Sequence, residues 1–173
     1  LYEGTEINGE TTGLITYMRT DSVIMSNEAI NQVRNFVTDN YGADYLPDSP
    51  RVYKSKAKNA QEAHEAIRPT DVNRKPSDMK KYLSTDQNKL YELIWNRTVA
   101  SQMVNSKHER KNLTISSKDG KYLFRAASRK NLFLGFEVLT KEDKDSDIQF
   151  PEELVESETL DLISESAEQK FTL

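Results

Sequence analysis

The stretch DQNKLYELIWNRTVASQMV, residues 86–104, has the clearest helical pattern in this 173-residue chain. Its apolar side chains recur every three or four residues, which is the spacing of one face of an α-helix. Asp86 stands at its start, where a carboxylate can cap the first turn. We therefore predict a helix over 86–104 whose buried face consists of Leu90, Leu93, Ile94, Ala100, Met103 and Val104, widened by Tyr91 and Trp95.

The hydrophobic period changes from 3.6 to 2 beyond about residue 108. Two alternating runs flank Asp119-Gly120, a dipeptide typical of tight hairpin turns. Further strands are predicted at 133–139 and 160–164, with a charged loop over 141–149 between them.

The part of the chain before residue 86 is predicted to be mainly helical. Its predicted elements are a strand over 13–18, a helix over 26–41 between the N-cap Ser26 and Gly42, a loop over 43–59, a short helix over 61–67 and another opening at Pro76. The predicted fold class is α+β: a mainly helical N-terminal module, 1–105, followed by an antiparallel β module, 106–173.

Composition and charge exclude several classes of protein and of binding site. The chain has no cysteine, which excludes disulfides and thiolate metal sites. No apolar run approaches the roughly 20 residues of a membrane span, and no signal peptide is visible, so a soluble cytoplasmic protein is expected. The net charge is −6 over 1–50, +5 over 51–81, +6 over 82–136 and −9 over 137–173. A basic middle is typical of a phosphate-binding surface, although solvated faces with chance charges would give the same counts.

Tyr17 and Arg19 form the first candidate site. If the predicted strand continues through Arg19, both side chains point to the same face. The planar guanidinium could then hold a phosphate beside the phenolic oxygen. A free phenol has a pKa of about 10, so attack at neutral pH needs a nearby cation or a base. The alternative interpretation is that Tyr17 is a half-buried strand aromatic and Arg19 a surface charge.

His64 and Arg68 form the second candidate site. They are four residues apart and share one face of the predicted 61–67 helix. Two neighbouring cationic side chains are best tolerated where an anion such as a DNA phosphate lies between them. A zinc helix requires His-Glu-x-x-His, and Arg68 stands where the second histidine belongs, so no metal site is predicted. The alternative is a capping and salt-bridge cluster on a solvated helix.

Two long segments, GLITYMRTDS at 13–22 and QEAHEAIRPT at 61–70, stand about 45 residues apart. The first resembles the active-tyrosine motif of the type IA DNA topoisomerases, and the second resembles the second signature of that family, in the family's order. LYEG at 1–4 and LYELIW at 90–95 also fit the bacterial topoisomerase I branch, and the resemblance is weaker beyond residue 105.

The resemblance implies a transient break in one DNA strand. Tyr17 is expected to attack the strand, form a 5′-phosphotyrosine link and leave a 3′-hydroxyl. Another strand then passes and the break is rejoined, which relaxes negative supercoils without ATP. Arg19 is expected to contact the scissile phosphate, and His64 to bind DNA near the cleavage point. Supporting DNA-binding roles are implied for Asp21, Ser22, Arg68 and Thr70.

The resemblance also implies Mg²⁺, bound by a Toprim domain of the same polypeptide. Asp143, Asp145 and Asp147 are interpreted as solvated, so this chain is not expected to bind the metal itself or to relax DNA alone. The start at Leu1 without Met and the end at Leu173 are interpreted as cut sites in a longer protein.

In that protein the helical module corresponds to the movable domain that carries the tyrosine, and the β module to part of the gate or arch. The expected partners are single-stranded and negatively supercoiled DNA in the bacterial nucleoid, and the Toprim domain. The alternatives are a non-catalytic single-stranded DNA-binding module and a purely structural interaction domain.

Overall fold

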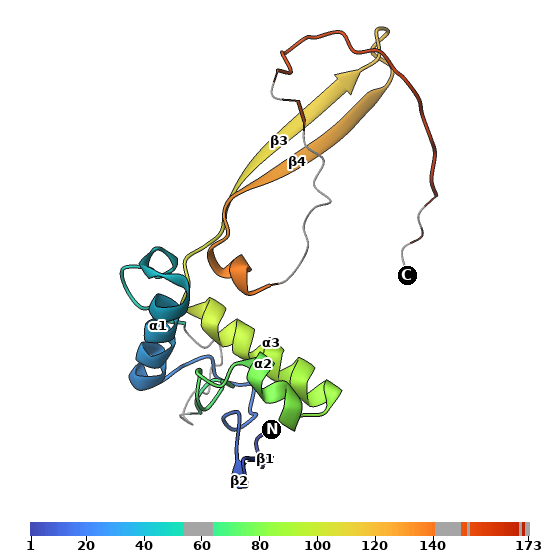
Figure 1. The fold of residues 1–173 in the computed structure, drawn as a ribbon. Helices are drawn as coiled ribbons and strands as arrows, with labels where there is room; N and C mark the ends of the chain where they lie inside the picture. The colour runs from blue at the N-terminus through green and yellow to red at the C-terminus, as the bar shows by residue number, and fades with distance from the viewer. Residues whose placement is uncertain (54–63, 141–149, 152, 170, 172–173) are drawn as a thin grey trace. The chain divides into compact units, whose positions relative to one another are not determined.

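The structure is a computed structural model that describes residues 1–53, 64–140, 150–151, 153–169 and 171. The chain divides into two compact units. The first contains Leu1–Glu109 and Asn131–Lys144, and the second contains Arg110–Lys130 and Asp145–Leu173. Helices and antiparallel strands are both present, which confirms the α+β class (Figure 1). The module boundary at 105/106 stays a prediction.

Helix α1, Asn27–Tyr41, confirms the helix predicted from its caps. The Ser26 hydroxyl accepts a hydrogen bond from the Ala29 backbone N–H at 3.2 Å. Gly42 ends the helix at φ 97° and donates its N–H to the Thr38 carbonyl. A short 3₁₀ turn, η1 (Ala43–Tyr45), follows at the start of the predicted 43–59 loop, whose last six residues lie outside the described part.

Helix α3, Thr85–Ser101, is the predicted long helix with three corrections. Its N-cap is Ser84, in a capping box with Gln87, because a hydroxyl followed three residues later by a glutamine satisfies two end groups at once. Asp86 is already inside the first turn, and the helix ends at 101 rather than 104. Leu90 and Leu93 are 49% and 55% exposed, so the predicted face is wrong at these positions.

The buried face of α3 is aromatic because Tyr91 and Trp95 find polar partners as well as apolar contacts. The Tyr91 hydroxyl donates to the Arg74 carbonyl at 2.7 Å, and Trp95 Nε1–H donates to the Val72 carbonyl at 2.9 Å. Trp95 also meets Phe36 of α1 edge-to-face at 5.3 Å between ring centroids. Burial raises the pKa of the Tyr91 phenol to about 12. The segment 70–76 is thereby held against α3, and the predicted helix at Pro76 is confirmed as α2, Pro76–Met79, followed by η2, Lys80–Tyr82.

The N-terminal strands differ from prediction. Strands β1 (Thr5–Ile7) and β2 (Glu10–Thr12) form an unpredicted hairpin. The strand predicted over 13–18 is wrong, since only Ile15 forms a bridge, with Pro69. Proline has no N–H, so a regular ladder cannot continue through it.

Strands β3 (Lys107–Ser116) and β4 (Leu123–Phe133) confirm the predicted hairpin around Asp119-Gly120 (Figure 1). The strand predicted at 133–139 is wrong. A 3₁₀ helix, η3 (Gly135–Leu139), stands there because Gly135, at φ 50°, turns the chain, and the Phe136 N–H donates to the Val104 carbonyl.

Residues 160–164 adopt no regular structure, because alternation alone makes no strand without a hydrogen-bonded partner strand. The predicted charged loop at 141–149 lies outside the described residues.

Candidate active site around Tyr17

Three extended segments lie side by side at the candidate site, with the Tyr17 segment in the middle. The Leu14 N–H donates to the Leu1 carbonyl at 2.8 Å on one side. On the other side the Thr70 N–H donates to the Leu14 carbonyl at 3.0 Å, and the Thr16 N–H to the Arg68 carbonyl at 2.9 Å. The segments that carry the two predicted motifs are therefore joined by backbone hydrogen bonds.

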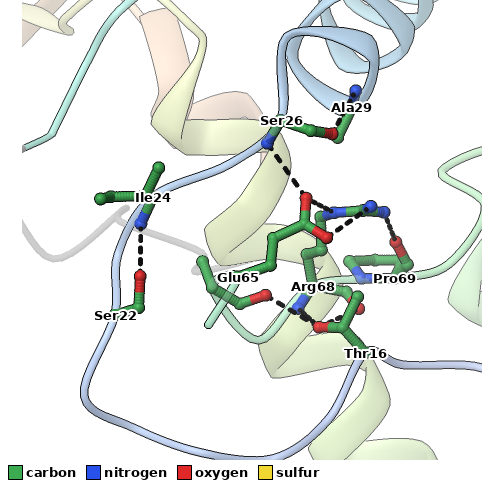
Figure 2. A network of polar contacts seen from close by, with 9 residues as sticks. Thr16, Ser22, Ile24, Ser26, Ala29, Glu65, Arg68 and Pro69 are labelled. Atoms are coloured by element: carbon green, nitrogen blue, oxygen red, sulfur yellow. Dashed lines mark hydrogen bonds and ion pairs between the residues drawn. The ribbon is translucent and has the colours of Figure 1, made fainter. Parts of the chain in front are cut away.

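The Thr16 side chain strengthens this junction (Figure 2). Its hydroxyl donates to the Ala66 carbonyl at 2.8 Å and accepts from the Arg68 N–H at 3.0 Å. Thr70 makes a comparable bond from its hydroxyl to the Gly13 carbonyl at 2.7 Å. Both threonine hydroxyls thus hold the backbones of the two motifs together.

Arg68 and Glu65 form a bidentate pair inside the second motif (Figure 2). Arg68 Nε and Nη2 donate to the two carboxylate oxygens at 2.7 and 3.0 Å, and the Ser26 N–H donates to the same carboxylate at 3.1 Å. Burial acts to raise the pKa of Glu65, but the hydrogen bonds from Arg68 and Ser26 and the Arg68 charge outweigh it and lower that pKa. Glu65 therefore links the second motif to the start of α1, and Arg68 holds the Glu65 carboxylate in place.

The helix predicted over 61–67 is not found in its described residues, 64–67, and 61–63 lie outside the described part. The backbone groups of Ala66 bond to Ile24 and Thr16 rather than to neighbours four residues away. His64 and Arg68 consequently do not share a helix face, and that expectation is wrong. Their DNA-binding roles stay predictions.

Tyr17 projects from the end of the joined segments and is 51% exposed, whereas Leu14 and Ile15 before it are buried. The Arg19 N–H donates to the Tyr17 carbonyl at 3.0 Å. This tight turn ends the extended run, so the predicted shared strand face for Tyr17 and Arg19 is wrong. The ring of Tyr17 contacts two other rings: Tyr2 at 5.4 Å between centroids and His64 at 6.3 Å.

Asp21 lies between Arg19 and His64, two other residues of the predicted site. Its Oδ2 atom lies 2.7 Å from Arg19 Nε and 3.6 Å from His64 Nδ1. Ser22 accepts a hydrogen bond from the Ile24 N–H at 3.2 Å and shapes the turn that follows (Figure 2). The fold thus gathers Tyr17, Arg19, Asp21 and His64 in one place, with a cation and a phenol accessible to a bound anion.

Sequence analysis missed Tyr2 and Glu65. Tyr2 belongs to the LYEG segment, but the unpredicted β1–β2 hairpin brings it to the site, so no local pattern could have placed it beside Tyr17. Glu65 stands three residues before Arg68, a spacing that signals a possible ion pair. Among the described residues no group of three or more His, Asp or Glu could hold a metal ion, and no described helix is long and apolar enough to span a membrane.

The sequence model of the DNA topoisomerase family matches residues 1–173. The chain belongs to the bacterial type IA DNA topoisomerase I family. It is 52% identical over 149 residues to DNA topoisomerase 1 of Rickettsia bellii, covering 86% of this chain and 19% of that protein. The corresponding Helicobacter pylori topoisomerase is 45% identical over 146 residues, with 84% and 20% covered.

A solved structure of full-length topoisomerase I from Thermotoga maritima is also similar. It has a TM-score of 0.69 and 41% sequence identity, over 87% of this chain and 23% of that one. The family resemblance drawn from the two motifs is thereby confirmed. This topoisomerase chain spans about a fifth of the length of the curated relatives it matches.

Proposed function

We propose that Tyr17 is the nucleophile of a DNA topoisomerase that cuts one DNA strand, passes another through the break and rejoins it. The observation that carries this proposal is the presentation of the phenol. The Tyr17 side chain is half exposed, whereas Leu14 and Ile15 before it are buried. Backbone hydrogen bonds hold this segment to Leu1 on one side and to Arg68 and Thr70 on the other. The activity relaxes negative supercoils.

The proposed reaction is a reversible transesterification, which cuts the strand in one direction and rejoins it in the other. The Tyr17 oxygen forms a bond to the phosphorus while the bond from phosphorus to the 3′ oxygen breaks. The phenol loses its proton, and the departing oxygen gains one to become the 3′-hydroxyl. The 5′-phosphotyrosine replaces one phosphate ester by another, so rejoining needs no ATP.

Arg19 supplies positive charge for the scissile phosphate in this proposal. Its guanidinium is half exposed and paired with Asp21, so a DNA phosphate would exchange with that carboxylate. His64, beside the Tyr17 ring, contacts DNA near the cleavage point. Asp21 and Ser22 shape the turn that presents Arg19. Thr70 and the backbone of Arg68 hold the two motifs together, and the Arg68 side chain pairs with Glu65.

The described residues offer no group of three or more His, Asp or Glu that could hold Mg²⁺. We propose that a Toprim domain of the same polypeptide binds the ion, and that the isolated chain does not relax DNA. Single-stranded and negatively supercoiled DNA are the proposed substrates.

Tyr17→Phe in the complete enzyme tests the nucleophile. The variant should form no covalent adduct with a single-stranded oligonucleotide under denaturing conditions, while its affinity for the same oligonucleotide stays within about twofold, because only the attacking oxygen is lost. An adduct that persists in Tyr17→Phe overturns the assignment. Binding without any adduct in the unmodified enzyme would instead support the non-catalytic DNA-binding alternative.

A further inference from the structure

Tyr2 contacts the proposed nucleophile although it lies fifteen positions earlier in the chain. The ring centroids of Tyr2 and Tyr17 are 5.4 Å apart, with an interplanar angle of 68°. This is the edge-to-face arrangement in which the positive ring edge of one aromatic meets the negative face of another. The geometry is directional, so it restrains the orientation of the Tyr17 ring.

The β1–β2 hairpin brings Tyr2 to this position. The chain reverses at Asn8 and Gly9, whose φ values are 53° and 88°, and returns alongside its own start. A Cβ at Gly13 would lie 2.9 Å from the Tyr2 carbonyl oxygen, so the close approach requires a residue without a side chain. The backbone of Tyr2 is therefore seated directly against the Tyr17 segment.

Core packing does not account for this contact. Tyr2 is 45% exposed and Tyr17 is 51% exposed, so neither ring belongs to the buried core of the first unit. An exposed tyrosine with a free side chain populates several χ1 rotamers. Contacts with Tyr2 and with His64 restrict that choice where the phenolic oxygen must meet a phosphorus atom.

We propose that Tyr2 is a positioning residue that holds the ring of Tyr17 in the orientation from which its oxygen attacks DNA. This inference rests on the proposed nucleophilic role of Tyr17. The ring of Tyr2, rather than its hydroxyl, carries the effect, since the contact is between ring edge and ring face. Tyr2 acts on the rate of the cleavage step and not on the affinity for DNA.

The test uses Tyr2→Ala, Tyr2→Leu and Tyr2→Phe in the complete enzyme. The readouts are the single-turnover rate of covalent adduct formation on a single-stranded oligonucleotide, the dissociation constant for the same oligonucleotide, and the melting temperature. Removing the ring should slow adduct formation roughly two- to tenfold, the size expected for one aromatic pair. Tyr2→Phe should restore the rate to within about twofold, and affinity should change less than about twofold in all three variants.

The Tyr2→Leu variant removes the aromatic ring but keeps an apolar side chain. A slower cleavage rate with an unchanged melting temperature would therefore come from loss of the ring and not from unfolding. Tyr122→Ala is the matched control, because Tyr122 is an exposed tyrosine of the second unit. It should cleave at the rate of the unmodified enzyme.

Cleavage at the unmodified rate by Tyr2→Leu overturns the proposal. So does a Tyr2→Phe variant as slow as Tyr2→Ala, or a loss of affinity equal to the loss of rate. The Tyr17→Phe variant separates failure of the nucleophile assignment from failure of the positioning role. An adduct in Tyr17→Phe would contradict the assignment of Tyr17 as the nucleophile. No adduct in Tyr17→Phe, together with normal cleavage by Tyr2→Leu, would contradict only the positioning role of Tyr2.

Discussion

Arg19 Nε lies 2.7 Å from Asp21 Oδ2, so the cation proposed for the scissile phosphate is already paired with a carboxylate two residues away. The pair is accessible, with side chains 49% and 37% exposed. A phosphate that enters the site competes with Asp21 for the same guanidinium donors. The strength of the Arg19–Asp21 pair therefore sets how readily Arg19 exchanges Asp21 for a DNA phosphate.

Asp21→Asn should strengthen binding of single-stranded DNA. Loss of the carboxylate charge removes the competitor of the phosphate, and we expect an oligonucleotide dissociation constant about two- to fivefold lower at low salt, with a smaller difference at high salt. Titration by fluorescence anisotropy measures it. Asp119→Asn changes the net charge equally at another ion pair, with Lys121. An equal gain in that control would show that net charge, and not release of Arg19, is responsible.

Thr16→Val should destabilise the chain, since it removes the hydroxyl that joins the two motifs. The Ala66 carbonyl and the Arg68 N–H lose their partner in a partly buried place, and we expect a loss of about 1–3 kcal/mol in the free energy of unfolding. Urea unfolding measures it. Thr38→Val loses one exposed bond to the Arg34 carbonyl in α1 and should change stability by less than about 1 kcal/mol. Equal effects in the two variants would contradict the joining role.

The lowered pKa of Glu65 predicts that the stability of the fold depends on pH. Its pKa is lowered in the folded state, so its contribution is complete above the ordinary glutamate pKa of about 4.3 and is lost as the pH falls through the lowered value. Glu65→Gln should therefore reduce the melting temperature at pH 6, and the gap to the unmodified protein should narrow as the pH falls below about 4. A gap that stays constant from pH 6 to pH 3 would show that the carboxylate charge contributes nothing.

Gly135→Ala should be more damaging than Gly120→Ala, although both glycines have positive φ, 50° and 69°. The left-handed conformation alone costs an alanine roughly 1–2 kcal/mol at either position. An added Cβ at Gly135 would also lie 2.5 Å from the backbone carbonyl of Asn105, whereas nothing lies within 4 Å at Gly120. Chemical denaturation of both variants should reveal this difference, and equal losses would mean that the backbone near Asn105 yields easily.

Local signals predicted the elements whose ends are decided within a few residues. Helix α1 begins at Ser26 and ends at Gly42 because a hydroxyl cap and a left-handed glycine act on their own neighbours. The β3–β4 hairpin follows its Asp119-Gly120 turn for the same reason. In contrast, the inner face of α3 was predicted incorrectly at Leu90 and Leu93, since periodicity alone does not say which apolar residues find a partner.

By itself the sequence determined the family and most residues of the candidate site, because a long motif of specific residue types can be recognised without knowledge of its surroundings. Only the tertiary structure decided how those residues meet. Arg68 turns to Glu65 rather than to His64, and Tyr17 meets Tyr2. Tyr2 and Tyr17 lie fifteen positions apart and meet through the β1–β2 hairpin, which no local pattern encodes. Glu65 and Arg68 stand only three residues apart, but their segment is held by backbone hydrogen bonds to other segments instead of forming the predicted helix.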